Sequence, residues 1–132
     1  NIIRKKNNSF ILLDGAHNTS GALVLKDTLN QIHEGKWVLI FGSLKTRNPL
    51  EFLKILKPIS NKIITVQIPN QKESFSEFEL LKAASKCGFE GNPAKSIKDA
   101  FNKANLIDYP ICICGSLYLA GEVLKLNKTI PD

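Results

Sequence analysis

The chain has 132 residues, of which 43% are hydrophobic, and a formal net charge of +6 at pH 7. This length accommodates one domain with a buried core and is too short for two. No apolar stretch is long enough to cross a bilayer and the first residues show no leader pattern, so we expect a cytoplasmic protein rather than a membrane or secreted one. The lysines are interleaved with acids and no aromatic residues accompany the basic cluster at residues 4–6, so we expect a solvated basic surface and no nucleic-acid partner.

Four short apolar runs predict the central strands of a parallel sheet. They are rich in β-branched or aromatic residues and mostly apolar on both faces, as strands covered by helices on both sides must be. Ile2 and Ile3 predict a further, antiparallel strand joined to the first run by a turn at residues 5–9, and Phe89 predicts the start of an edge strand. The four runs are residues 10–13, 37–41, 63–68 and 111–114.

Helical patterns fill the gaps between these runs. Pro49 opens one helix, Pro58 closes it near its end, and Gly88 is placed to cap another. The alternation of strands and helices predicts one α/β domain over residues 1–132, a Rossmann-like open, mostly parallel sheet with right-handed crossovers and helices on both faces. The apolar stripes that predict the other helices are Ala22, Leu25, Leu29 and Ile32; Phe78, Leu81 and Ala84; and Ile97, Ala100, Phe101 and Ala104.

Polar residues follow three of the predicted strands at the point where each one ends. Asp14 and His17 follow the first, the segment 42–48 with Arg47 follows the second, and Gly115 with Ser116 follows the last. Ligands of open parallel sheets bind beyond the carboxyl ends of the strands. The sequence therefore predicts one binding site to which these three junctions contribute.

Each of these residues has a functional and a structural interpretation. Asp14 could contact ribose hydroxyls or help to organise a loop, or be an acid that stabilises a helix N-terminus. His17 could contact an anion, or be a structural histidine, and Asn18 could cap the next helix. Arg47 could hold a carboxylate or phosphate through two hydrogen bonds, or belong to an exposed basic loop. Ser116 could bind an anion at a helix start, or be a simple N-cap.

Several site types have no support in the sequence. There is no GxxxxGK(S/T) loop and no GxGxxG, so the chain has no phosphate grip of its own. Cys112 and Cys114 lack a second ligand pair, so we predict no metal site, and the three cysteines are expected to be reduced. Ser116, His17 and Asp14 could form a hydrolytic triad, but the GxSxG elbow is missing.

Four motifs nevertheless resemble a known family in order and spacing. The chain is similar to the C-terminal domain of bacterial folylpolyglutamate synthase/dihydrofolate synthase, in the Mur ligase superfamily, over nearly its whole length. The resemblance implies an ATP-dependent amide ligase that phosphorylates a folate or dihydropteroate carboxylate and then joins L-glutamate to it. ATP and Mg²⁺ are then held mainly by an N-terminal domain of the same protein, which this chain lacks. The motifs are LLDGAHNTSGA, VLIFGSLKTRNP, SFSEFELLKAA and ICICGSLYLAGEVL.

The resemblance also implies roles for the junction residues. Asp14 matches the acid that contacts the nucleotide, His17 a catalytic histidine near the nucleotide and the incoming glutamate, and Ser116 a serine for glutamate. Where relatives often carry a DKD-like triplet, this chain has Thr46-Arg47-Asn48, which places Arg47 where the lysine stands; we expect it to bind glutamate with Ser116. The rival interpretations are the C-terminal domain of a peptidoglycan Mur ligase and a non-catalytic α/β module that binds a small anion.

Overall fold

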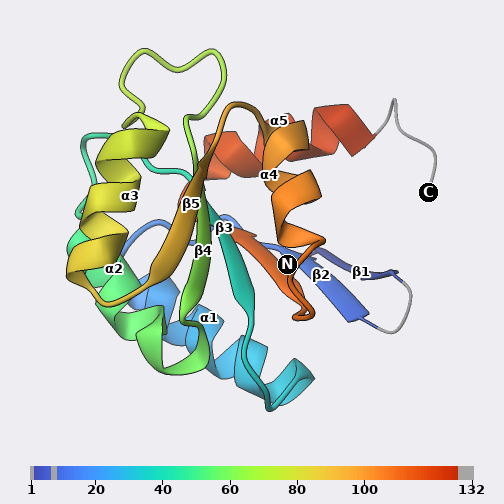
Figure 1. Cartoon of the computed structure of the whole chain (residues 1–132). Helices are drawn as coiled ribbons and strands as arrows, with labels where there is room; N and C mark the ends of the chain where they lie inside the picture. Colours follow the sequence, from blue (N-terminus) through green and yellow to red (C-terminus); the bar gives the residue numbers. More distant parts are fainter. Residues whose placement is uncertain (1, 7–8, 128–132) are drawn as a thin grey trace.

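The computed structural model describes residues 2–6 and 9–127 and places six strands in one sheet (Figure 1). Their order across the sheet is β1-β2-β6-β3-β4-β5. β1 is antiparallel to β2, and the remaining neighbours are parallel. This confirms the predicted open, mostly parallel sheet. The strands are β1 (Ile2–Lys6), β2 (Ser9–Leu13), β3 (Val38–Phe41), β4 (Lys62–Val66), β5 (Glu90–Ala94) and β6 (Ile111–Cys114).

Helices cover both faces of the sheet. On one face α1, α2 and α3 enclose a hydrophobic cluster, and on the other α4 and α5 enclose a second (Figure 1). Along β3, Leu39 belongs to the first cluster and Ile40 to the second, because successive side chains of a strand point to opposite faces. This two-sided burial explains why the central strands are apolar throughout. The helices are α1 (Thr19–Ile32), α2 (Pro49–Leu56), α3 (Glu77–Lys86), α4 (Ile97–Ala104) and α5 (Leu117–Asn127), with a short 3₁₀ helix, η1 (Lys57–Ile59).

The boundary signals in the sequence agree with the observed ends. Pro49 is the first residue of α2, and Gly88 follows α3 with a φ of 86° that an L side chain rarely adopts. Asn18 accepts a hydrogen bond from the Gly21 N–H and so caps α1. β1 extends to Lys6, into the predicted turn, of which residues 7 and 8 lie outside the described part.

Two details of the expected pattern are wrong. β4 ends at Val66, because the chain turns into the loop that leads to α3. The apolar stripe of α3 is buried at Leu80 and Ala84, whereas Phe78 is 66% exposed. The capping box formed by Ser76 fixes where the helix starts, and this start turns the side chain of its second residue away from the sheet. Within the described residues, no helix is long and apolar enough to cross a membrane.

The three cysteines differ in accessibility, which predicts their reactivity. Cys112 and Cys114 are buried and Cys87 is partly exposed, and burial raises the pKa of Cys112 and of Cys87. Because the thiolate is the reactive form, we expect Ellman's reagent to titrate one thiol slowly in the native chain and all three in denaturant. Cys87→Ser should abolish the native reaction. Fast reaction of more than one thiol without denaturant would contradict the burial of β6.

Candidate functional site

The three polar junctions lie side by side because β6 is inserted between β2 and β3. The backbone joins them directly. The N–H of Gly115 donates to the carbonyl of Ala16 at 2.9 Å, and the N–H of Gly42 donates to the carbonyl of Cys114 at 3.4 Å. The carboxyl ends of the three strands therefore form one edge, as the sequence predicts.

Gly115 makes this close approach possible. Its φ is +109°, in the region that favours glycine, and a Cβ atom there would overlap the carbonyl oxygen of Gly42. It would also stand 2.8 Å from the ring of Phe41. A larger residue would have to push the β3 and β6 junctions apart.

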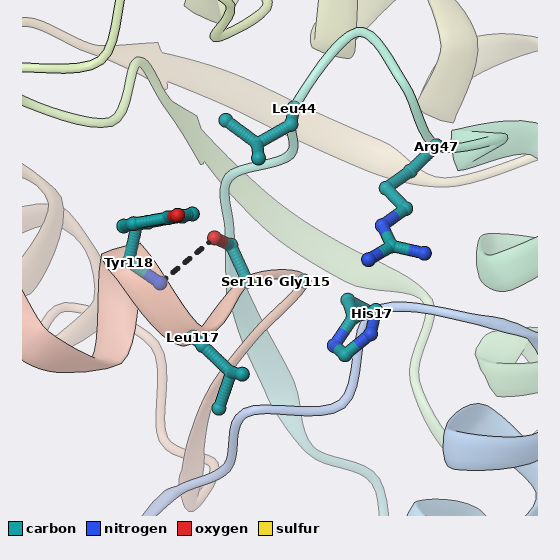
Figure 2. A pocket seen from close by; sticks show the side chains of 7 residues that line it. All are labelled: His17, Leu44, Arg47, Gly115, Ser116, Leu117 and Tyr118. Atoms are coloured by element: carbon teal, nitrogen blue, oxygen red, sulfur yellow. Dashed lines mark hydrogen bonds between the residues drawn. The ribbon is translucent and has the colours of Figure 1, made fainter.

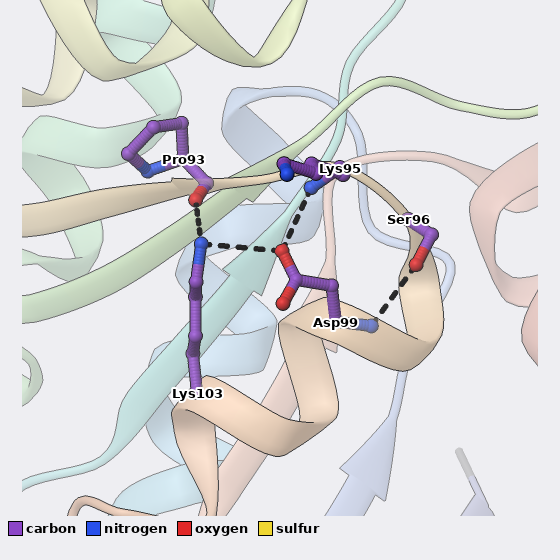
Figure 3. Close-up of polar contacts among 5 residues, drawn as sticks. All are labelled: Pro93, Lys95, Ser96, Asp99 and Lys103. Carbon is purple, nitrogen blue, oxygen red and sulfur yellow. Dashed lines mark hydrogen bonds and ion pairs between the residues drawn. The ribbon is translucent and has the colours of Figure 1, made fainter.

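A small pocket of about 50 Å³ opens at this edge (Figure 2). Its volume accommodates a group of a few heavy atoms, such as one carboxylate. It brings together three of the four predicted site residues, from three separate junctions. Asp14 is not among the residues that line it. The lining residues are His17, Leu44, Arg47, Gly115, Ser116, Leu117 and Tyr118.

The imidazole of His17 is oriented by the turn that carries it. Its Nδ1 lies 2.9 Å from the carbonyl oxygen of Gly15. A carbonyl oxygen only accepts, so Nδ1 carries the proton, and Nε2 of the neutral ring is left as the basic nitrogen. In Figure 2 the Arg47 side chain points toward the ring from the same side of the view, with Tyr118 and Leu117 on the other side. His17 is therefore a fixed group that can accept or donate one proton through Nε2.

Asp14 shapes the turn that precedes His17. Its Oδ1 accepts a hydrogen bond of 2.7 Å from the N–H of Ala16, whose carbonyl in turn receives the N–H of Gly115. This contact matches the interpretation of Asp14 as a loop-organising acid. The side chain is half-buried, so a nucleotide contact through its other oxygen stays a prediction.

Ser116 caps α5, as its structural interpretation requires. Its Oγ accepts the N–H of Tyr118 at 3.0 Å, and the side chain is only 3% exposed. The hydroxyl still has its own proton to donate, so capping does not exclude contact with an anion. The backbone N–H of Gly115 donates to the carbonyl of Ala16, so this amide is not available to a ligand. The helix start therefore offers an anion fewer free donors than the sequence suggests.

Arg47 reaches the pocket from an exposed turn. Its N–H donates to the carbonyl of Leu44 at 3.0 Å, and Asn48 caps α2 immediately afterwards. Among the described residues Arg47 has no acidic partner within ion-pair distance. The guanidinium is therefore a cation whose charge no described acid neutralises, and its N–H donors can bind an anionic ligand.

Sequence reasoning missed three lining residues, Leu44, Leu117 and Tyr118. One signal could have found the leucines, because Gly-Ser-Leu occurs at residues 42–44 and again at 115–117. Both copies follow strands that turn out to be neighbours, so each leucine faces the shared pocket. The serines differ: Ser116 lines the pocket, whereas the Ser43 hydroxyl donates to the carbonyl of Leu44.

The charge of the pocket suits an anion. The seven lining residues include a guanidinium, an imidazole and the two hydroxyls of Ser116 and Tyr118, and no carboxylate. The described residues contain no group of three His, Cys, Asp or Glu side chains that could hold a metal ion. Mg²⁺ prefers carboxylate and phosphate oxygens, so this pocket does not fit it.

The fold and the site define the class of protein. It is an open α/β domain whose parallel strands end at an anion-compatible pocket. The chain belongs to the family described as "Dihydrofolate synthetase, C-terminal domain", whose sequence pattern matches residues 2–126.

Known proteins agree with this assignment. Folylpolyglutamate synthase of Lacticaseibacillus casei is 28% identical over 119 residues, which are 86% of this chain and 26% of that protein. The crystal structure of folylpolyglutamate synthase from Thermotoga maritima superposes with a TM-score of 0.78 at 26% identity, over 97% of this chain and 30% of that one. The folylpolyglutamate synthase of Mycobacterium tuberculosis, solved with ADP and AMPPCP, superposes with a TM-score of 0.81 at 24% identity, over 93% of this chain and 30% of that one. This chain thus spans about a quarter to a third of these relatives.

Proposed function

We propose that this chain is the C-terminal domain of an ATP-dependent ligase that joins L-glutamate to a folate or dihydropteroate through an acyl phosphate. The observation that carries the proposal is the convergence of His17, Arg47 and Ser116 in one acid-free pocket, in a chain of the dihydrofolate synthetase family. A protein of similar fold, FolC of E. coli, has been solved with DHPP and ADP, and the folylpolyglutamate synthase of Mycobacterium tuberculosis with ADP and AMPPCP. The family match favours this function over the peptidoglycan ligase and the small-anion module.

In this proposal the pocket holds one carboxylate of the incoming glutamate. Arg47 supplies two parallel N–H donors and Ser116 supplies its hydroxyl proton. The pocket has room for one carboxylate, and in this pose the amine would lie outside it. Fixing the amine beside the acyl phosphate makes amide formation effectively intramolecular.

His17 would then serve the reacting amine. Glutamate enters as an ammonium ion, which must lose a proton before its nitrogen can attack the acyl phosphate. The Nε2 of His17 is the basic atom of the pocket, since Nδ1 is committed to Gly15. The new C–N bond forms as the bond from carbon to phosphate oxygen breaks, and the second proton that the nitrogen loses leaves with inorganic phosphate.

ATP would lie between this chain and the rest of the protein. Asp14 and His17 are the residues of this edge that we propose to contact the nucleotide. The chain has no phosphate loop, and its described residues offer no cluster for Mg²⁺. We therefore assign the phosphates and Mg²⁺ to a preceding N-terminal domain, and expect this chain alone to be inactive.

Substitution of His17 and Asp14 in the full-length protein tests the proposal. His17→Ala and Asp14→Ala should each lower kcat/KM by at least about tenfold. His17→Ala should leave the melting temperature nearly unchanged, since strand-end groups serve ligands more than packing, whereas Asp14→Ala also removes the acceptor of the Ala16 N–H and should lower it. The assay follows phosphate release that depends on ATP, glutamate and a pteroate together. Asp14→Asn keeps an acceptor for the N–H of Ala16 and removes the charge, so it separates turn formation from nucleotide contact. Activity that falls only in proportion to stability would reject these roles.

A further inference from the structure

The loop between β4 and α3, residues 67–76, connects two walls of the pocket. In Figure 1 it projects beyond the carboxyl ends of the strands, between α3 and α5. One part of the loop pairs with the segment that carries Arg47, and another part contacts α5, which begins next to Ser116. We call these residues the bridging loop.

The first contact ties the bridging loop to the Arg47 segment. The N–H of Lys45 donates to the carbonyl of Glu73 at 2.7 Å, and the N–H of Phe75 donates to the carbonyl of Ser43 at 3.0 Å. Together they form a short antiparallel pairing. Arg47 stands two residues beyond this pairing, in the turn that it starts. The position of the guanidinium therefore depends on where the bridging loop is held.

The bridging loop is braced from within. The hydroxyl of Ser74 accepts the N–H of Ile68 at 2.9 Å and donates to the carbonyl of Phe75 at 2.9 Å. Ser74 is 4% exposed and Ile68 is 1% exposed, so both are anchored in the interior. A buried, satisfied hydroxyl of this kind rigidifies the segment around it. A displacement at one end of the loop is therefore passed on to the other.

The second contact ties the bridging loop to α5. The Nδ2 of Asn70 donates to Oε1 of Glu122 at 2.9 Å, while Oε2 of Glu122 pairs with Nζ of Lys125 at 2.9 Å. The Glu122 side chain is only 13% exposed, and its hydrogen bond with Lys125 lowers its pKa, which keeps the carboxylate ionised. Asn70 has a φ of 63°, a left-handed conformation that asparagine tolerates better than other non-glycine residues. The backbone is held in an uncommon state where this side chain makes its contact.

We propose that Asn70 and Glu122 are positioning residues that fix the distance between the Arg47 guanidinium and the Ser116 hydroxyl. This inference rests on the proposed function of the pocket as the glutamate carboxylate site. Neither side chain lines the pocket. They act through the bridging loop, which links the Arg47 segment to the helix that Ser116 caps. A small displacement of substrate-binding groups lowers the reaction rate strongly, so a fixed distance between these two groups before glutamate binds favours productive binding.

The test uses Asn70→Gly in the full-length protein, because glycine keeps the left-handed backbone and removes only the side-chain contact. Hydrogen exchange of the amides of Lys45 and Phe75 should accelerate by about threefold or more through local opening. The amide of Trp37, bonded to Ile59 on the opposite side of the domain, serves as the control and should not change. The KM for glutamate should rise about threefold to tenfold, with kcat and the KM for ATP changed less than about twofold.

A double substitution distinguishes loss of the contact between Asn70 and Glu122 from nonspecific destabilisation. Asn70→Asp alone sets two carboxylates against each other and should resemble Asn70→Gly, whereas Asn70→Asp together with Glu122→Gln restores a hydrogen bond of reversed direction and should recover the glutamate KM. Unchanged exchange at Lys45 and Phe75, or failure of this rescue, would overturn the inference. Arg47→Ala serves as the reference. If it raises the glutamate KM and Asn70→Gly does not, the positioning role is wrong; if neither does, the proposed glutamate site itself is wrong.

Discussion

Gly115→Ala is expected to lower the free energy of unfolding of this chain by about 3 kcal/mol or more. Two independent costs add: alanine would have to adopt a φ of +109°, and its methyl group would overlap the carbonyl of Gly42 beside the ring of Phe41. The neighbours that would have to yield are backbone and a buried ring. Urea unfolding, followed by the fluorescence of the single, fully buried Trp37, measures the change.

Gly121→Ala is the matched control for this substitution. Gly121 lies in α5, and a Cβ atom there would meet nothing within 4 Å. Because alanine has the higher helix propensity, the variant should be more stable than the parent chain by about 0.5–1 kcal/mol. The two glycines are six residues apart and should respond with opposite signs. A Gly115→Ala variant within about 0.5 kcal/mol of the parent chain would contradict the close contact between the β3 and β6 junctions.

Arg47→Ala in the full-length protein is expected to raise the KM for glutamate by about tenfold to 150-fold, which corresponds to the ~1.5–3 kcal/mol of a lost charged hydrogen bond. The KM for ATP should change far less, because the proposal assigns Arg47 to the glutamate carboxylate and assigns the nucleotide to Asp14, His17 and the N-terminal domain. Ser116→Ala should shift the same parameter less. Initial rates at varied glutamate and at varied ATP separate the two constants.

Lys45→Ala is the control for charge in the same segment. Lys45 is exposed, does not line the pocket, and uses its backbone N–H, which alanine retains, to pair with Glu73. Its loss should change the glutamate KM by less than about twofold, since exposed charges contribute little. Ser116→Ala also removes the cap of α5, at a cost of about 1 kcal/mol, so kinetics must be measured well below the melting temperature. A selective effect of Arg47→Ala on ATP would show that this glutamate site is wrong.

Much of the site could be predicted because its residues stand at strand ends. His17, Arg47 and Ser116 each follow an apolar run that reads as a buried strand, and parallel strands share one carboxyl edge. The sequence did not determine the role of Asp14, because it does not show whether the carboxylate contacts a ligand or accepts the N–H of Ala16. Tyr118 carried no signal of its own, since its place in the pocket depends on where α5 starts.

The sequence by itself determined the elements and their class, because periodicity, prolines and caps are local properties of the chain. Only the tertiary structure decided that β6 lies between β2 and β3, and that the bridging loop contacts α5 through Asn70, 52 residues from Glu122. These contacts join residues that are far apart in the sequence. Their stability comes from the packing of many side chains together, so no local pattern in the sequence predicts them. The expected burial of Phe78 failed for the same reason: the hydrophobic period marks a helix, whereas the contacts of its first turn decide which face is buried.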